Sequence, residues 1–255
     1  MHLYFFAGNC TENLSRKTGG QSCYFPVFFP MAFLFFSPAA DFVSLPFSVS
    51  LSILFSSLLR EMKKKKIVCF GDSLTSCGGK NGRYSDMLQK SLPSYIFINS
   101  GKGGDTIGGG LARLETAVLK HRAGYLIIGL GANDYWQQKR SLYELKQDYD
   151  TILARCHAAG MKIVIISCFG NEKLPPDVMP DFDKAGTPKE HYAAGLAIIE
   201  RELAKKYQAG YVPDMQCGIT PKGRRDLWSD SNHPNAAGNR IVADTILPEL
   251  RKILQ

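Results

Sequence analysis

The fold class of this chain is decided by the stretch Ile67-Val-Cys-Phe-Gly-Asp-Ser-Leu-Thr75. Its first four residues are apolar, and a short apolar run that ends at a glycine is typical of a buried strand. A helix is expected downstream, from about Arg83 to Leu92. The stretch therefore predicts a buried strand that leads toward a helix, with Ser73 at the turn after the strand.

The same alternation of strand and helix continues to the end of the chain. Further strands are predicted at 95–98, 125–130, 163–166 and 211–212, and helices after Thr106, at 142–159, at 187–208 and from Pro234 onward. Pro248 is expected to kink or split the last helix, because proline has no backbone N–H to donate. Strands that alternate with helices imply parallel strands joined by crossovers. We therefore expect a three-layer α/β/α sandwich around a mostly parallel, flavodoxin-like sheet of five strands.

Small or polar residues follow the first three predicted strands, and a fourth such segment lies near the C-terminus. The segments are Gly71–Thr75, Asn99–Thr106, Gly129–Asp134 and Asp230–Pro234. In a sheet of this kind the ligand site lies beyond the carboxyl ends of the strands. Taken singly, each segment is typical of a turn, a helix cap or a loop ion pair. Their occurrence together favours one site that all four help to build.

These four segments resemble the sequence blocks of the SGNH hydrolase superfamily, also called GDSL esterases and lipases. The chain carries Gly-Asp-Ser-Leu, then Gly-Asp-Thr, then Gly-x-Asn-Asp and finally Asp-x-x-His-Pro, in the order of that family. The resemblance covers essentially all of residues 62–255 and none of residues 1–61. It implies a GDSL-type esterase or acylhydrolase that cleaves acyl ester or thioester bonds through an acyl-enzyme.

Ser73 is then the expected nucleophile, since a serine hydroxyl attacks a carbonyl once an adjacent base removes its proton. His233 suits the role of that base, and Asp230 can fix its tautomer and stabilise the charge that it gains. The resemblance implies three donors for the oxyanion: the backbone N–H groups of Ser73 and Gly104, and the side-chain amide of Asn133. Glycine is expected at 104 because a side chain there would obstruct the approach to the carbonyl.

Aromatic residues lie close in sequence to these blocks, at Tyr135, Trp136 and Trp228. We expect them, with the loop at 171–187, to shape the acyl or alcohol pocket; the alternative is that they are ordinary packing aromatics. Three aspartates that follow strands are instead expected to organise the loops by bonding backbone N–H groups, namely Asp72, Asp105 and Asp134.

The sequence leaves the substrate open. The family spans lysophospholipases, thioesterases, arylesterases and carbohydrate O-acetylesterases, so a lipid, carbohydrate or other small acyl ester is expected. The alternatives are a carbohydrate O-acetylesterase in particular, or a non-catalytic binding module on the same fold. No cofactor or metal is expected: the seven cysteines form no C-x-x-C pair, Gly79-Lys80 lacks the flanking residues of a P-loop, and Gly129–Asp134 lacks the third glycine of a dinucleotide fingerprint.

The first 61 residues differ in composition from the rest. They hold 11 of the 15 phenylalanines but only 6 of the 54 charged residues. We expect two parts, a Phe/Ser-rich extension at 1–61 and an SGNH hydrolase domain at 62–255. Three interpretations of the extension stay open: an over-long gene prediction whose true start is Met62, a membrane segment at 42–59, which its six serines and Pro46 make marginal, or a disordered extension.

The chain is basic, with a formal net charge of +8 at pH 7. Half of that excess lies in the run Lys63–Lys66, which is typical of a solvated N-terminus rather than a nucleic-acid site. An odd number of cysteines follows residue 61, which favours a reducing compartment, so we expect a cytoplasmic protein. Membrane contact is expected only if 42–59 inserts, and the lysines would then keep the domain on the cytoplasmic side. The oligomeric state stays open.

Overall fold

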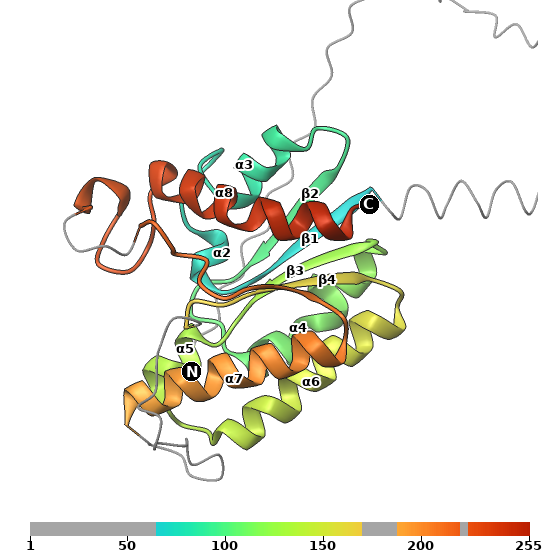
Figure 1. Ribbon diagram of the computed structural model, residues 1–255, viewed down its shortest axis with the longest axis vertical. Helices are drawn as coiled ribbons and strands as arrows, with labels where there is room; N and C mark the ends of the chain where they lie inside the picture. The colour runs from blue at the N-terminus through green and yellow to red at the C-terminus, as the bar shows by residue number, and fades with distance from the viewer. Residues whose placement is uncertain (1–64, 170–187, 220–223) are drawn as a thin grey trace, which may run out of the picture. The chain divides into compact units, whose positions relative to one another are not determined.

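A computed structural model of the chain describes residues 65–169, 188–219 and 224–255, and its centre is a parallel sheet (Figure 1). In these ranges the sheet has five strands: β1 Lys66–Gly71, β2 Ile96–Gly101, β3 Tyr125–Gly129, β4 Lys162–Ile166 and β5 Gly210–Val212. Their order is β2-β1-β3-β4-β5, and each neighbouring pair is parallel. This order is that of flavodoxin-like sheets, so the predicted fold class is confirmed.

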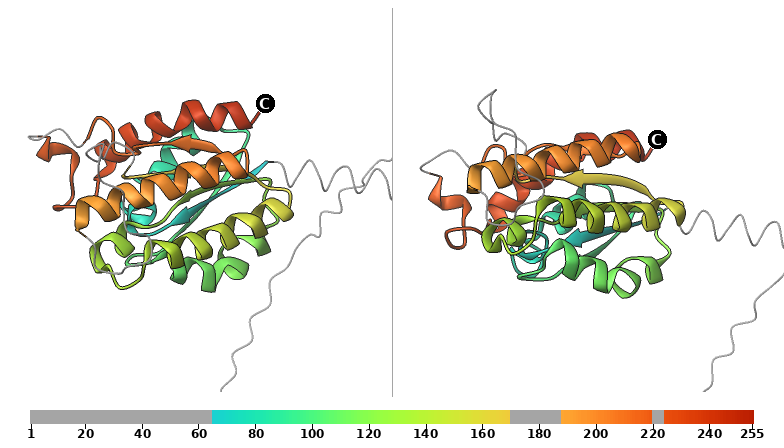
Figure 2. Two further views of the ribbon diagram at one scale, coloured as in Figure 1. Left: turned by 60° about the horizontal axis from the view of Figure 1, so that its bottom comes forward. Right: turned by 90° about the horizontal axis from the view of Figure 1, so that it is seen from below.

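Helices cover both faces of the sheet and complete the three layers (Figures 1 and 2). They are α2 Ser73–Ser76, α3 Tyr84–Ser91, α4 Ile107–Ala117, α5 Ala132–Gln137, α6 Leu142–Ala158, α7 Lys189–Lys206 and α8 Ala236–Ile253, with short 3₁₀ turns at η1 Leu119–His121 and η2 Arg225–Leu227. Helices α3 and α8 pack on one face, and α4, α6 and α7 pack on the other.

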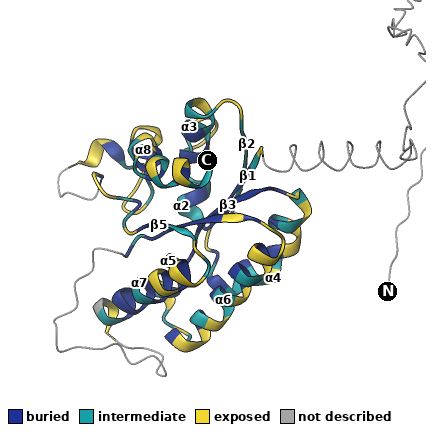
Figure 3. Cartoon of the chain, turned by 45° about the vertical axis from the view of Figure 1, so that its right-hand side comes forward, coloured by how far each residue is buried: buried dark blue, intermediate teal, exposed yellow. Residues whose placement is uncertain are grey.

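The alternation of side chains along β1 explains why both faces need a helical layer. Ile67 and Cys69 belong to the core under α3 and α8, whereas Val68 and Phe70 belong to the core under α4, α6 and α7. All four side chains are buried, because successive side chains of a strand point to opposite faces of the sheet. Figure 3 shows the strands as the buried centre of the molecule. Each such apolar side chain contributes roughly 1.5–3 kcal/mol to folding.

The last helix corrects one prediction, because α8 runs without a break through Pro248. Val242, Ile246 and Leu250 face the core and are fully buried along this helix. Pro248 and Asp244 are exposed, so the carbonyl that loses its hydrogen-bond partner to proline lies on the solvent side. The expected split is therefore wrong, and burial of the apolar face outweighs the missing hydrogen bond.

The ends of the three central strands lie side by side. Gly71 at the end of β1 is in register with Gly101 of β2 and with Gly129 of β3. A Cβ atom at Gly71 would overlap the side chain of Thr75 and the carbonyl oxygen of Gly129, so only glycine fits this position. The absence of a side chain lets the turn that carries Ser73 approach the neighbouring strand closely.

Residues 1–64, 170–187 and 220–223 lie outside the described ranges. The candidate membrane segment at 42–59 and the whole of the loop at 171–187 therefore fall on residues that the structure does not describe. Among the helices of the described ranges, none combines the length and the apolar character that a bilayer span requires.

Candidate active site

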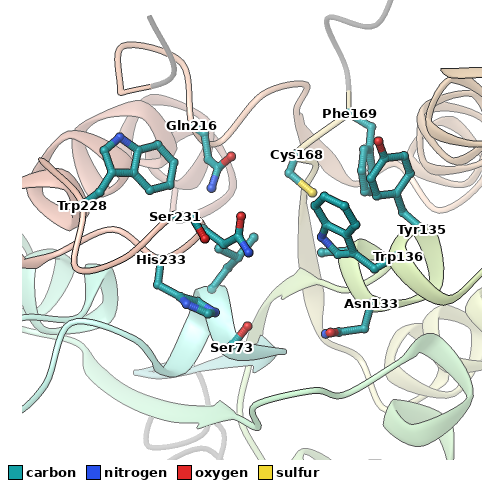
Figure 4. Close-up of a pocket in the computed structure, with 13 residues that line it drawn as sticks. Ser73, Asn133, Tyr135, Trp136, Cys168, Phe169, Gln216, Trp228, Ser231 and His233 are labelled. Carbon is teal, nitrogen blue, oxygen red and sulfur yellow. The ribbon is translucent and has the colours of Figure 1, made fainter. Parts of the chain in front are cut away.

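A cavity of about 300 Å³ opens beyond the carboxyl ends of the strands (Figure 4). Three of the predicted catalytic residues line it, namely Ser73, Asn133 and His233, and so do all three predicted pocket aromatics. The full lining is Ser73, Leu74, Ala132, Asn133, Tyr135, Trp136, Cys168, Phe169, Gln216, Trp228, Ser231, Asn232 and His233. The structure thus brings together segments that are up to 160 residues apart in the chain.

Ser73 is the first residue of α2, directly after the turn that ends β1. The buried side chain of Asp72 caps this helix and accepts a hydrogen bond from the backbone N–H of Leu74 at 2.9 Å. Removal from water raises the pKa of the Asp72 carboxyl to about 6. As predicted, Asp72 organises the turn around Ser73 through a backbone N–H group.

His233 and Asp230 form a pair, and His233 stands across the cavity from Tyr135 and Trp136 (Figure 4). His233 Nδ1 lies 2.8 Å from Asp230 Oδ2 and 3.0 Å from Oδ1. In Figure 4 the imidazole ring extends toward Ser73. The backbone N–H groups of Asn232 and His233 also donate to Asp230, each at 2.8 Å. The N–H of Asn232, followed by the bonds from His233, lowers the pKa of Asp230 to about 2, so this carboxylate is charged at neutral pH.

Hydrogen bonds within the segment hold the His233 backbone in place. The N–H of Ser229 donates to the carbonyl of His233 at 2.8 Å, and Trp228 forms an isolated antiparallel bridge with Pro234. The side chain of Asn235 then caps α8 by accepting hydrogen bonds from the backbone N–H groups of Ala237 and Gly238. His233 therefore lies on a short loop whose backbone is held by hydrogen bonds before and after the histidine.

Asn239 connects the histidine segment to the serine segment. Its side chain is fully buried, and its Nδ2 donates to the carbonyls of Cys77 and Pro234, both at 3.2 Å. Cys77 caps the C-terminal end of α2, and Pro234 follows His233. One amide thus fixes the distance between the two elements that carry Ser73 and His233.

The predicted oxyanion donors differ in how they meet the cavity. The side chain of Asn133 lines it, and one of its two amide hydrogens is directed to the carbonyl of Asp105 at 2.8 Å. Gly104 is the residue before Asp105 and is exposed, but it is not among the lining residues. Its φ is +74°, and a Cβ atom there would meet no protein atom within 4 Å. The positive φ therefore favours glycine here, whereas no neighbouring protein atom requires it by close contact. The expected obstruction of the substrate's approach stays a prediction.

The two other aspartates after the strands behave differently from each other. Asp134 Oδ2 accepts a hydrogen bond from the backbone N–H of Ile107 at 2.9 Å, as predicted, and burial raises its pKa to about 6. The buried carboxylate of Asp105 instead pairs with the side chain of Arg113, whose Nε lies 2.5 Å from Oδ2. The expectation of a backbone partner for Asp105 is therefore wrong.

The aromatic residues both pack against one another and line the cavity. The Tyr135 ring lies 5.1 Å from that of Trp136, in an edge-to-face arrangement, and 5.3 Å from that of Phe169. Trp136 is 57% exposed. Trp228 stands across the cavity from these rings (Figure 4), held by a hydrogen bond from its Nε1 to the carbonyl of Ile219 at 3.1 Å. These aromatic residues therefore pack against neighbouring side chains and also line the cavity; that they shape an acyl or alcohol pocket stays a prediction.

Three lining residues were missed from the sequence: Cys168, Phe169 and Gln216. The first two follow β4 and the third follows β5, so the rule that located Ser73 and Asn133 applies to them as well. Cys168 lies two residues after the end of β4 at Ile166, and its thiol faces the cavity (Figure 4). Extending the search to the last two strand ends would have found all three.

The chain matches known proteins over most of its length. The model of the GDSL-like lipase/acylhydrolase family matches residues 69–241. An arylesterase of Vibrio mimicus is 32% identical over 218 residues, which are 81% of this chain and 98% of the relative. Esterase TesA of Pseudomonas aeruginosa is 23% identical over 203 residues, which are 77% of this chain and 93% of the relative.

Solved structures share the fold. A crystal structure of TesA has a TM-score of 0.60 at 24% identity and covers 74% of this chain and 99% of its own. An acetyl xylan esterase, AlAXEase, has a TM-score of 0.57 at 22% identity, with 72% of this chain and 98% of its own covered. These neighbours have the same three-layer architecture.

Proposed function

Because this chain belongs to the GDSL-like lipase/acylhydrolase family and is a carboxylic-ester hydrolase, we propose that Ser73 is the nucleophile, His233 the general base and Asp230 its partner. The observation that carries this proposal is the shared cavity: Ser73 and His233 line it together, and Asp230 bonds Nδ1 of the histidine from behind. A serine, a histidine and a carboxylate in this relation are the parts that acyl transfer requires.

The proposed first step forms the acyl-enzyme. Ser73 Oγ attacks the carbonyl carbon of the ester while its proton passes to Nε2 of His233. Asp230 keeps the other ring nitrogen, Nδ1, protonated and stabilises the imidazolium. The low pKa of Asp230, about 2, supports this role, because the carboxylate is charged at neutral pH and can stabilise the imidazolium. The bond to the alcohol or thiol then breaks, and His233 returns the proton to the leaving group.

The second step releases the acid. Water enters the cavity, His233 removes its proton, and the hydroxide attacks the acyl carbon that Ser73 carries. The second tetrahedral intermediate collapses, the proton returns to Ser73 Oγ, and the carboxylic acid leaves. Both steps place a negative charge on the same substrate oxygen.

We assign the stabilisation of that oxygen to the backbone N–H groups of Ser73 and Gly104 and to the side-chain amide of Asn133. The bond from Asn133 to the carbonyl of Asp105 supports this assignment, because it fixes the amide plane with one hydrogen and leaves the second for the oxyanion. The loss of one such donor typically costs about 100- to 1,000-fold in kcat.

A carbohydrate O-acetylesterase is the second candidate for the finer activity. The observation that favours it is Trp136, a 57%-exposed ring at the edge of the cavity, where a sugar ring of the leaving group could pack on the aromatic face. Acyl groups longer than acetyl would instead have to fill the apolar part of the cavity beside Cys168 and Phe169.

One set of assays tests these assignments. The full chain is assayed on p-nitrophenyl esters from acetyl to palmitoyl, on acyl-CoA and on acetylated xylose oligomers, with Ser73→Ala beside it. Ser231→Ala is the matched control, since this hydroxyl lines the same cavity. We expect Ser73→Ala to lose activity by about 10,000-fold or more, Ser231→Ala to lose little, and a phosphonate ester to label Ser73 in intact-mass and peptide analysis.

The outcomes separate the alternatives. Equal activity in wild type and Ser73→Ala would exclude this nucleophile. The absence of turnover in both would place the ester that this hydrolase cleaves outside these three substrate classes. Turnover of acetyl substrates alone would favour the acetylesterase.

The domain boundary and the location are also proposals. We propose that residues 62–255 form the hydrolase domain, because the first strand begins at Lys66 and the family match begins at residue 69. Expression of residues 62–255 beside the full chain tests the boundary, and equal kcat in both is expected. We further propose that the domain works in the cytoplasm, which fractionation of cells that express the native gene would test.

A further inference from the structure

The side chain of Arg113, on α4, lies beneath the ends of β1 and β2. It is 18% exposed, and its three nitrogen atoms have three different partners. Nε pairs with Asp105 Oδ2 at 2.5 Å, Nη1 donates to the carbonyl of Ser100 at 2.8 Å, and Nη2 donates to the carbonyl of Gly71 at 2.9 Å. One guanidinium thus bonds three segments of the chain at once.

These partners adjoin the proposed oxyanion donors. Gly71 comes two residues before Ser73, and Asp105 comes directly after Gly104. The backbone carbonyl of Asp105 accepts the bond from the Asn133 amide. The guanidinium therefore bonds directly to the segments that carry Ser73 and Gly104, and it reaches the Asn133 segment through Asp105.

The geometry of the guanidinium matches this arrangement and an ammonium does not. Its planar fork can donate in three directions, and its face stacks on the ring of Phe70, whose centroid lies 4.4 Å from Cζ. A lysine at the same position could reach only part of this set. Ion pairs as buried as this one add little net stability, because desolvation offsets most of the attraction. Stability alone is therefore a weak reason for this pair.

We propose that Arg113 is a positioning residue that holds the Gly104 and Asn133 donors of the oxyanion hole in register with Ser73. The inference rests on the proposed function of those three residues. Arg113 is outside the cavity lining and acts through Asp105, Ser100 and Gly71.

The predicted consequence is specific to the transition state. The donors of an oxyanion hole bind the charge that develops in the reaction more strongly than the ground-state carbonyl. Displacing them should lower kcat and leave KM almost unchanged. A variant that merely loosens the fold would instead lower the thermal unfolding temperature and the fraction of active protein, without this split.

The experiment measures kcat, KM and thermal unfolding of the full chain for wild type and Arg113→Lys. We expect kcat to fall roughly 10- to 100-fold, less than the loss of a whole donor, with KM within about threefold. Arg155→Lys is the matched control. Arg155 pairs at 2.9 Å with Glu115, also on α4, but this pair is exposed and remote from the cavity. We expect its kcat to stay within about twofold of wild type.

A double-mutant cycle tests the route of the effect. If Arg113 acts through the placement of Asn133 and Gly104, then Arg113→Lys should cost less in an Asn133→Ala background than in wild type. Equal costs in both backgrounds would mean that the two residues act independently and would overturn the inference. Should Arg113→Lys fail to fold, Asp105→Asn takes its place, because it removes the charge partner and keeps the backbone carbonyl.

The proposed nucleophile and the proposed role of Arg113 are tested by different variants. Wild-type activity in Ser73→Ala would remove the proposed function and this inference with it. An inactive Ser73→Ala together with wild-type kcat in Arg113→Lys and Asp105→Asn would overturn the role of Arg113 alone. The expected result is a loss of kcat in Arg113→Lys and in Asp105→Asn, together with a smaller loss from Arg113→Lys when Asn133 is already alanine.

Discussion

Replacing Glu200 by glutamine should stabilise the protein, and most strongly at alkaline pH. Glu200 lies on α7, is 1% exposed and sits beside the hydroxyl of Ser167, just beyond the end of β4. Its Oε2 and the hydroxyl of Tyr149 are both buried without a hydrogen-bond partner among the described residues. Burial raises the pKa of this carboxyl to about 8, and the contact with Ser167 opposes the rise only in part.

The sign and size follow from linkage. The ordinary pKa is 4.5, so between about 4.5 and 8 the folded protein holds a proton that the unfolded chain has released. The free energy of unfolding is therefore unaffected by this group below pH 4.5. It falls as the pH rises from 4.5 to about 8 and is lowest above pH 8. A rise of the pKa from 4.5 to about 8 corresponds, at about 1.36 kcal/mol for each pH unit, to a loss of unfolding free energy of at most about 5 kcal/mol.

Glutamine has nearly the same shape as glutamate and no charge, so Glu200→Gln should lose the fall in unfolding free energy between pH 4.5 and 8. Urea denaturation at pH 5, 7 and 9 gives the unfolding free energy of variant and wild type, and their difference should grow with pH. The control is Glu202→Gln on the same helix, an exposed carboxylate that pairs with Lys146. A difference for Glu200→Gln that stays constant from pH 5 to 9 would refute the reasoning.

Two further predictions concern the cavity. Asp230→Asn should lower kcat roughly 100- to 10,000-fold, and a kcat within threefold of wild type would contradict the role of Asp230. Because the pKa of Asp230 is about 2, the plot of wild-type kcat against pH should show no inflection from this carboxyl above about pH 3. Cys168→Leu adds bulk to the lining, so kcat/KM for palmitoyl relative to acetyl esters should fall about 10-fold or more, and an unchanged ratio would show that acyl chains do not pass Cys168.

The lining of the cavity was predictable from the sequence where it comes from segments that directly follow strands. Ser73 and Asn133 occupy such positions, and the topology of a parallel sheet brings them together whatever the details of packing. The link from His233 to Asp230 was predictable for another reason: a spacing of three residues in a loop allows a local hydrogen bond. The three-layer, parallel architecture followed from the alternation of strands and helices along the chain.

The contacts of Arg113 and Asn239 were not predictable in this way. Arg113 lies on a helix, and its partners are set by how α4 packs against the ends of β1 and β2, which no local pattern encodes. Asn239 bonds a carbonyl 162 residues earlier in the chain. Continuity through Pro248 depended likewise on tertiary burial, since the apolar face of α8 outweighs the local preference of proline.

The proposed base pair of His233 and Asp230 (the base half) and the proposed oxyanion donors (the oxyanion half) are held in place by different interactions. The side chain of Asp230 is 55% exposed, so backbone N–H groups of its own loop, rather than burial, keep it charged and oriented toward His233. The oxyanion half depends on the buried pair of Asp105 and Arg113, where an unpaired charge would be costly. Salt screens exposed charges far more than buried ones. Raising the ionic strength should therefore affect the base half first and leave the oxyanion half almost unchanged.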